Sequence, residues 1–213
     1  MKKIRVMLTD DHAVVRSGMA RLLEKNEDIT IAGEADSGEQ AYQLFTDIEP
    51  DILIMDMSMP GMGGLEALRR IIARYSKAKV IMFSMHENVT FAVQAMTAGA
   101  MGYVAKSGDA QDLVNAVRDV VAGKSFLSAE MAQKIALQNM SGQEDPTQRL
   151  TAREFEVFRL LAEGNTVDEI AHILNIGQKT VANYQTSLKQ KLGIQSSVEL
   201  VRLAMKYDLI HTH

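Results

Sequence analysis

The chain has 213 residues, of which 46% are hydrophobic and 23% are charged, as expected for a soluble globular protein of one or two domains. It contains no cysteine, which excludes disulfides and thiolate metal sites. No apolar run approaches the roughly 18 residues of a membrane span, and the start is not typical of a signal peptide, so we expect a cytoplasmic protein without a membrane partner. The formal net charge is −4, and residues 147–213 carry 8 Lys and Arg against 7 Asp and Glu, so DNA contacts would need a local basic cluster.

The first 123 residues alternate short apolar runs with segments of helical periodicity. Strands are predicted at residues 4–9, 29–33, 51–55, 79–83 and 102–105, and helices at 14–25, 41–47, 64–75, 88–98 and 110–122. Short, continuous apolar runs are typical of parallel strands that are buried on both faces. The alternation therefore predicts an α/β fold with a doubly wound, five-stranded parallel sheet.

Polar side chains stand where four of these strands end. They are Asp10 and Asp11, Asp56, Ser84, and Lys106. Because an open parallel sheet binds ligands just outside the carboxyl ends of its strands, we expect these side chains to converge. Three carboxylates in one place repel one another, and a divalent cation would relieve that repulsion.

These positions, together with Tyr103, resemble the receiver domain of a two-component response regulator. The resemblance covers about residues 3–123 and includes the loop Asp56-Met-Ser-Met-Pro-Gly-Met-Gly-Gly64 and the stretch Gly99-Ala-Met-Gly-Tyr-Val-Ala-Lys106. It implies a flavodoxin-like strand order, 2-1-3-4-5, and a receiver domain that spans residues 1–123. It also implies that a sensor histidine kinase donates a phosphoryl group to Asp56.

The resemblance implies a role for each residue of the acidic pocket. Mg²⁺ would be held by Asp10, Asp11, Asp56 and the backbone carbonyl of Ser58. Lys106 would pair with Asp56 and later with a phosphoryl oxygen. His12 and His86 flank this site; we expect them to be ordinary polar loop residues, with tuning of hydrolysis as the alternative.

Two further residues are expected to act as a switch. The hydroxyl of Ser84 would turn toward the new phosphoryl group, and the ring of Tyr103 would swing into the vacated space, which couples a local charge to a surface. Met85 stands where many receivers have a small residue, so its side chain is expected to cover Asp56 in part.

The pattern changes after residue 123. Residues 128–139 predict one more helix, and the polar, proline-containing segment 141–149 predicts a flexible connection, so residues 124–149 are expected to form the linker. From residue 150 the pattern is purely helical, with capping-box spacings that begin at Thr151, Thr166 and Ser196. A turn at residues 175–177 precedes a helix that begins near Gln178, which is typical of a helix-turn-helix.

Residues 150–210 resemble the LuxR-type DNA-binding domain of the NarL/FixJ class. The matching residues are Leu150-Thr-x-Arg-Glu154, Gly164, Glu169-Ile-Ala171, Leu174, Lys179-Thr-Val181 and Lys191-Leu192, and Thr180-Val181 and Val198-Glu-Leu200 are similar to the GacA/UvrY subgroup. The resemblance implies an all-α domain of four helices at residues 150–213. It further implies a transcription factor that forms a homodimer on activation and meets RNA polymerase.

The helix that begins near Gln178 carries two different faces. Its core face holds Val181, Tyr184, Leu188 and Leu192, and the residues expected to contact DNA are Lys179, Thr180, Ala182, Asn183, Thr186, Lys189 and Lys191. Such a helix can enter the major groove. The lysines suit phosphates, Asn183 suits an adenine edge, and Ala182 or Thr186 suits a thymine methyl group.

Two other classes of protein remain as alternatives. A phosphohydrolase of the haloacid dehalogenase type also forms an aspartyl phosphate, but it needs Asp-x-Asp after its first strand. Here the acceptor follows the third strand and Ser58 replaces the second carboxylate, so we do not expect an enzyme. A signalling module whose last domain binds protein or RNA would show no salt-dependent binding to DNA.

Overall fold

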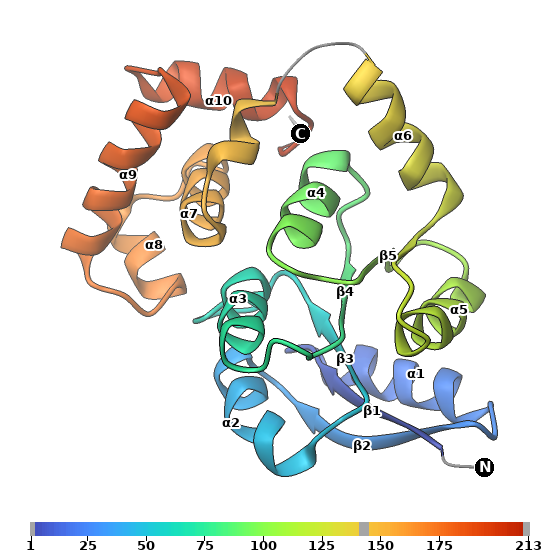
Figure 1. Ribbon diagram of the computed structural model, residues 1–213. Coiled ribbons are helices and arrows are strands. Elements are labelled where there is room, and N and C mark those ends of the chain that lie inside the picture. Colours follow the sequence, from blue (N-terminus) through green and yellow to red (C-terminus); the bar gives the residue numbers. More distant parts are fainter. Residues whose placement is uncertain (1–2, 141–144, 211–213) are drawn as a thin grey trace.

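The computed structural model describes residues 3–140 and 145–210 (Figure 1). The strands are β1 (Ile4–Thr9), β2 (Ile29–Ala35), β3 (Ile52–Asp56), β4 (Val80–Ser84), β5 (Gly102–Ala105) and β6 (Phe126–Leu127). The helices are α1 (Ala13–Glu24), α2 (Gly38–Ile48), α3 (Gly64–Arg74), α4 (Val89–Thr97), α5 (Ala110–Val121), α6 (Ala129–Met140), the 3₁₀ helix η1 (Pro146–Arg149), α7 (Ala152–Ala162), α8 (Val167–Ile173), α9 (Gln178–Leu192) and α10 (Ser197–Lys206).

The strands form one parallel sheet in the order β2-β1-β3-β4-β5-β6. Every residue of β3 is buried, and successive side chains point to opposite faces of the sheet. Ile52 and Ile54 therefore pack in a core with α1 and α5, while Leu53 and Met55 pack in a second core with α2, α3 and α4. The doubly wound fold that the alternating pattern predicts is confirmed.

The sheet has one strand more than the sequence predicts. Phe126 and Leu127 pair in parallel with Gly102 and Tyr103 at the edge of the sheet. A strand of two residues is too short to show a period in the sequence, which explains why it was not predicted. It lies within residues 124–149, so the beginning of the predicted linker is part of the sheet.

Helices α7–α10 form the four-helix domain that the sequence predicts. Complete capping boxes begin α7 and α8, where Thr151 and Thr166 exchange hydrogen bonds with the glutamates three residues later. At α10 only half of the box forms, because the carboxylate of Glu199 accepts from the backbone of Gln195 instead of Ser196.

The end of the predicted flexible segment is also ordered. Residues 141–144 lie outside the described residues, but Asp145 caps η1 and its carboxylate accepts from the backbone and the hydroxyl of Thr147. Both side chains are buried against α4, where Thr90 donates to Asp145 and Gln94 donates to the carbonyl of Thr147. This segment therefore fastens the last domain to the receiver-like domain.

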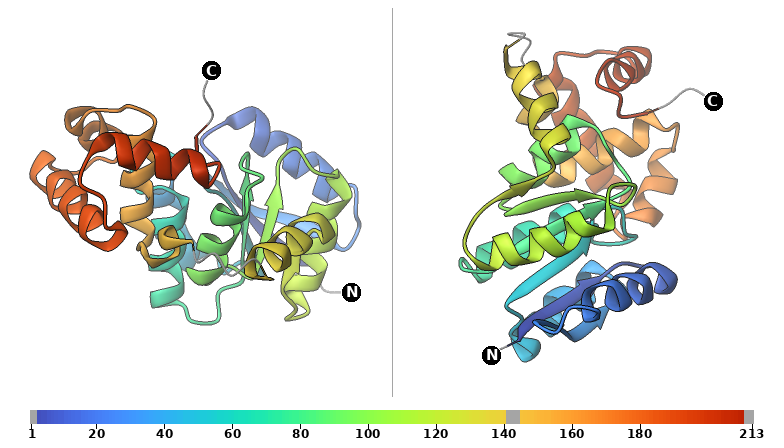
Figure 2. Two further views of the ribbon diagram at one scale, coloured as in Figure 1. Left: turned by 90° about the horizontal axis from the view of Figure 1, so that it is seen from above. Right: turned by 90° about the vertical axis from the view of Figure 1, so that its right-hand side faces the viewer.

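Figures 1 and 2 show α7–α10 beside α3 and α4, so the helical domain covers one side of the sheet domain. The ring of Phe91 on α4 meets the ring of Phe155 on α7 edge to face, with centroids 5.2 Å apart. Within the described ranges, no helix combines the length and the apolar character that crossing a membrane requires.

Candidate functional site

The register of the sheet brings the predicted site residues to one edge. In neighbouring strands Thr9 pairs with Met55, and Ser84 pairs with Ala105. The residues at or just after these strand ends, Asp10, Asp56 and Lys106, therefore lie together, as expected for parallel strands.

The pocket places buried charges in direct contact. The Asp10 and Asp56 residues are 0% and 4% exposed, and Nζ of Lys106 lies 2.6 Å from Oδ2 of Asp10 and 3.1 Å from Oδ1 of Asp56. Burial raises the pKa of Asp56 above its ordinary value, while the Lys106 ammonium opposes that rise. The lysine thus offsets part of the cost of burying a charged carboxylate at Asp56.

The carboxylates also fit a bound cation. Asp10, Asp11, His12 and Asp56 each offer one ligand atom, and these atoms lie within 4.8 Å of one another. Oδ1 of Asp11 is buried and accepts no hydrogen bond. Carboxylate oxygens are the ligands that Mg²⁺ prefers, so the donor set suits this ion. The exposed Ser58 lies two residues after Asp56, and its backbone N–H donates to the Asp56 carboxylate.

Ser84 and Tyr103 both bind the backbone of His86. The N–H of His86 donates to Oγ of Ser84 at 3.1 Å, and the hydroxyl of Tyr103 donates to the carbonyl of His86 at 2.6 Å. The Tyr103 ring is already buried, at 1% exposure, and this burial raises the pKa of its phenol. The ring therefore already lies inside the domain, in the position predicted for it only after phosphorylation.

The loop that follows Asp56 is held by the helical domain. Nη1 of Arg153 on α7 donates to the carbonyls of Gly61 and Met62, at 3.1 and 3.2 Å. The N–H of Gly61 donates to the carbonyl of Ile173 on α8, at 2.8 Å. Because these bonds cross between the domains, the loop after Asp56 and the helical domain are directly connected.

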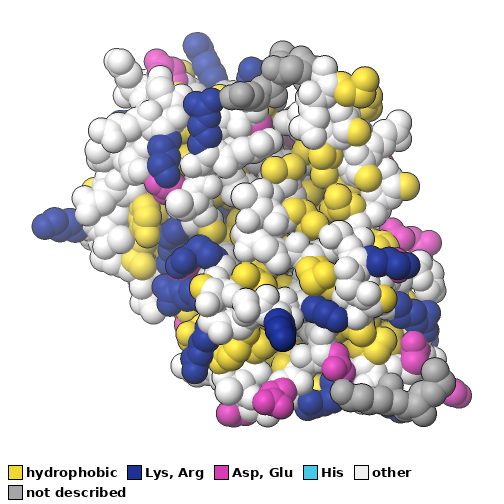
Figure 3. All heavy atoms as spheres, in the orientation of Figure 1, with side chains coloured by type: hydrophobic (Ala, Val, Ile, Leu, Met, Phe, Trp, Pro, Cys, Tyr) yellow, Lys and Arg dark blue, Asp and Glu magenta, His cyan; other side chains and the backbone are white. Residues whose placement is uncertain are grey.

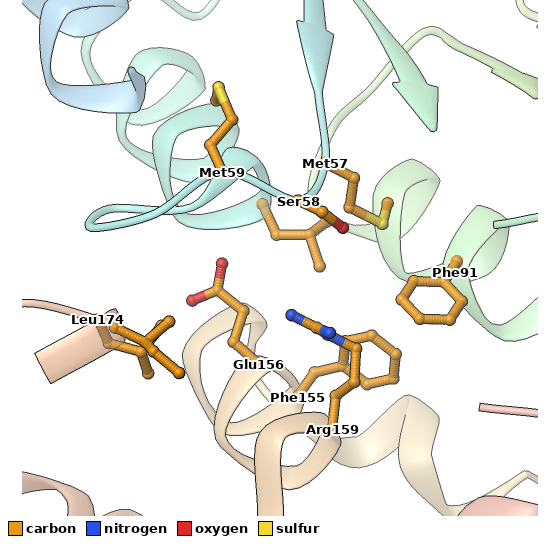
Figure 4. Close-up of a pocket in the computed structure, with 10 residues that line it drawn as sticks. Met57, Ser58, Met59, Phe91, Phe155, Glu156, Arg159 and Leu174 are labelled. Atoms are coloured by element: carbon orange, nitrogen blue, oxygen red, sulfur yellow. The ribbon is translucent and has the colours of Figure 1, made fainter. Parts of the chain in front are cut away.

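A small cavity lies beside this loop, between the two domains (Figure 4). Its volume is about 30 Å³, and its lining includes Met57, Ser58, Phe91, Phe155, Glu156 and Arg159. Burial raises the pKa of the Glu156 carboxyl to about 7, although Arg153 opposes the rise. A Cβ on Gly63 would meet Oε1 of Glu156 at 1.9 Å, so glycine permits this close packing.

The face of α9 that is predicted to contact DNA points to solvent. Lys179, Thr180, Ala182, Asn183 and Thr186 are exposed, and Lys189 is half-buried. Figure 3 shows Lys and Arg side chains spread along the side of the molecule where α9 lies, between uncharged ones. The basic side chains there are separated by uncharged ones and do not form a broad basic surface.

Two of the residues predicted to contact DNA make bonds within the domain. The hydroxyl of Thr186 donates to the carbonyl of Ala182, and Nζ of Lys191 lies 2.6 Å from Oε2 of Glu154. The buried Glu154 also accepts from Ser187, so it fastens α9 to the start of α7. The sequence indicates Glu154 as a helix cap and as part of the LuxR-type match, but it does not show the contacts with α9, because those partners are more than 30 residues away.

Two family models match the chain. The response regulator receiver domain matches residues 6–118, and the luxR family of bacterial regulatory proteins matches residues 148–204. The two matches correspond to the sheet domain with the acidic pocket and to the helical domain with α9.

Several known proteins resemble the whole chain. Response regulator UvrY of Escherichia coli is 38% identical over 97% of this chain and 95% of its own length, and response regulator GacA of Pseudomonas aeruginosa is 35% identical over 97% and 98%. The structure of RcsB from Salmonella enterica serovar Typhimurium, bound to a promoter in the presence of phosphomimetic BeF3-, superposes with a TM-score of 0.73. That likeness has 27% identity and covers 96% of this chain and 100% of that chain.

Proposed function

The chain belongs to the response regulators that join a receiver domain to a LuxR-type DNA-binding domain, and we propose that phosphorylation of Asp56 by a sensor histidine kinase controls its binding to double-stranded DNA. The observation that carries the proposal is the contact of Lys106 with Asp10 and Asp56 at the edge of the sheet. The family is one of transcriptional regulators, so the phosphohydrolase alternative is excluded. We propose domain limits of 1–123 and 150–213, with 124–149 as the connection.

The phosphoryl transfer uses one nucleophile. A carboxylate oxygen of Asp56 forms a bond to phosphorus as the bond from phosphorus to the histidine nitrogen of the kinase breaks, which leaves an acyl phosphate. Lys106 then pairs with a phosphoryl oxygen. Mg²⁺, held by Asp10, Asp11, Asp56 and the backbone carbonyl of Ser58, would neutralise charge on the transferring oxygens.

In the proposed switch, His86 would transmit the change from Ser84 to Tyr103. When Oγ of Ser84 turns to the phosphoryl group, it gives up the bond from the His86 N–H, and the acceptor of the Tyr103 hydroxyl is then free to shift. The His86 ring stacks on Phe91 with centroids 3.8 Å apart, and Phe91 touches Phe155 of the DNA-binding domain. Through this packing, a local change at the pocket could shift side chains on α7.

We propose that DNA binding uses α9 in the major groove and a homodimer on a two-fold symmetric site, with RNA polymerase as a further partner at the promoter. The exposure of Asn183 and Ala182 supports direct reading of base edges by α9. One recognition helix reads few base pairs, and residues 147–213 carry nearly balanced charge. Two copies on one site gain from effective concentration, which supports activation by dimerisation.

The phosphoacceptor is tested with acetyl phosphate and Mg²⁺. We expect intact-protein mass spectrometry to show one added, base-labile phosphoryl group on the native chain and none on Asp56→Asn. Asp47→Asn, at an exposed position of α2, is the matched control and should be phosphorylated as the native chain is. A phosphorylated Asp56→Asn chain would contradict the proposal.

Dimerisation is tested by analytical ultracentrifugation before and after phosphorylation, together with a footprint of the bound DNA. We expect a larger sedimenting species after phosphorylation and protection of two half-sites about one helical turn apart, or closer if the helices meet head to head. A phosphorylated chain that stays monomeric and protects a two-fold site at unchanged affinity would refute this part of the mechanism.

A further inference from the structure

His12 joins the carboxylates of the acidic pocket. Its Nδ1 lies 3.0 Å from Oδ1 of Asp11 and 3.2 Å from Oδ1 of Asp10. His12 stands at the N-cap of α1, but its side chain makes no capping hydrogen bond. The imidazole is therefore directed to the carboxylates and not to the helix.

The backbone N–H of His12 donates to Oδ1 of Asp10 at 2.8 Å, so this carboxylate does not depend on the imidazole for a hydrogen bond. A ring nitrogen carries at most one hydrogen, yet two carboxylate oxygens lie within 3.2 Å of Nδ1. Oδ1 of Asp11 remains buried without a hydrogen bond. The Lys106 ammonium contacts two of the three carboxylates, those of Asp10 and Asp56, so negative charge in the pocket exceeds the charge of this lysine. A cation that takes the place of the Nδ1 hydrogen would therefore meet this nitrogen and the carboxylate oxygens together, where negative charge is in excess.

We propose that His12 is a nitrogen ligand through which this pocket binds Zn²⁺, Ni²⁺ and Co²⁺ in competition with Mg²⁺. The inference deepens the proposed function and rests on it, because the same carboxylates would hold either kind of ion. Imidazole suits the late first-row metals, whereas Mg²⁺ prefers oxygen. Four protein ligands also match the usual coordination number of zinc.

The position of His12 makes it accessible to an entering ion. Its side chain is 66% exposed at the rim of the pocket, whereas the Asp10 side chain is fully buried. The ammonium of Lys106 has to yield to any cation that binds both Asp10 and Asp56, which weakens Mg²⁺ and Zn²⁺ alike. The difference between the two ions therefore depends on His12.

Calorimetric titration of the full chain with MgCl₂, NiCl₂ and ZnCl₂ tests the proposal. We expect His12→Gln to bind Zn²⁺ and Ni²⁺ about tenfold or more weakly, and Mg²⁺ within about twofold of the native chain. His172→Gln, at an exposed position of α8, is the matched control and should bind every ion as the native chain does. Thermal unfolding should be unchanged in both variants, because both side chains are exposed.

Nitrogen NMR gives a second measurement on the native chain. With ¹⁵N-labelled histidine rings, saturating Zn²⁺ should shift one Nδ1 resonance that is missing from His12→Gln. Each of three results would overturn the ligand role of His12. The native chain and His12→Gln could bind Zn²⁺ with equal affinity, or the His12 resonance could stay unshifted. The variant could also lose affinity for Mg²⁺ and Zn²⁺ to the same extent. A native chain that binds Zn²⁺ through His12 but no Mg²⁺ would instead contradict only the magnesium site of the proposed function.

Discussion

The acidic pocket and the exposed face of α9 are built in opposite ways. The pocket gathers buried side chains from several strand ends, and Lys106 neutralises part of their charge within the chain. The α9 face comes from one helix, and Asn183 and Lys179 point to solvent. The pocket is therefore preorganised in a single copy, whereas the α9 face loses its water only when it meets a partner.

This difference indicates which interactions supply the free energy for each function. Charges in the pocket are already desolvated, so a small chemical change there acts on strong interactions. In the proposed complex, polar groups on α9 exchange water for DNA, so each contact would contribute modestly and affinity would depend on the number of copies. Substitutions should consequently have large effects where buried charge is disturbed and small ones at exposed positions.

The largest loss of stability is expected from Glu154→Gln, which disturbs the buried support beneath α9. Burial alone would raise the pKa of Glu154, but Lys191, Ser187 and Thr151 lower it from 4.5 to about 2. A lowered pKa stabilises the fold fully above the ordinary value, and that stability is lost as the pH falls from about 4.5 toward 2. The variant should lose roughly 3 kcal/mol of unfolding free energy at neutral pH.

Urea unfolding at pH 7 and at pH 3 measures this effect. The difference between the native chain and Glu154→Gln should shrink at the lower pH. Glu169→Gln is the matched control, because Glu169 holds the same capping-box position on α8 but is exposed. Equal losses in the two variants would show that capping, and not the bond to Lys191, gives Glu154 its importance.

A moderate effect is expected at the exposed face itself. Asn183→Ala should weaken binding to the specific DNA site by about 1–3 kcal/mol and leave binding to random DNA nearly unchanged. Lys179→Ala should instead weaken binding to specific and to random DNA. It should also lower the slope of the logarithm of the binding constant against the logarithm of the salt concentration by about one. Fluorescence anisotropy at several salt concentrations distinguishes the two patterns. If Asn183→Ala lost equal affinity for the specific site and for random DNA, Asn183 would be assigned to a phosphate contact.

The smallest effect is expected at Met85. The sequence predicts that this side chain covers Asp56 in part, but in the structure it is 70% exposed and lines a groove between α4, α6 and α10. Met85→Ala should therefore change the rate of phosphorylation by acetyl phosphate by no more than about twofold, less than 1 kcal/mol in the barrier. A much faster variant in stopped-flow or mass-spectrometric assays would restore the covering role.

The sequence allows the pocket to be predicted because strand ends are local signals. Asp10, Asp56 and Lys106 each follow an apolar run, and the parallel fold alone brings them together. The capping boxes at Thr151 and Thr166 are equally local, and the structure contains both. The roles of these residues stay predictions, since only their geometry is described.

Contacts between distant segments could not be predicted in this way. Arg153 reaches a loop more than 90 residues earlier, and Lys191 turns back to Glu154 although its position on α9 suggested DNA. No periodicity links such partners, because each pair depends on how elements that are far apart in the chain pack together. The same holds for β6, whose pairing is decided by the edge of the sheet and not by its two residues.

The hydrogen bonds that Arg153 and Ile173 make with the loop after Asp56 connect the two domains. Any free energy of coupling between phosphorylation and DNA binding acts equally in both directions. If the phosphorylated chain binds its operator tenfold more tightly, then the operator-bound chain must favour phosphorylation tenfold as well, a coupling of about 1.4 kcal/mol. The operator is then an effector of the phosphorylation equilibrium. At the same concentration of phosphoryl donor, the phosphorylated fraction would then differ between chains bound to the promoter and chains in solution.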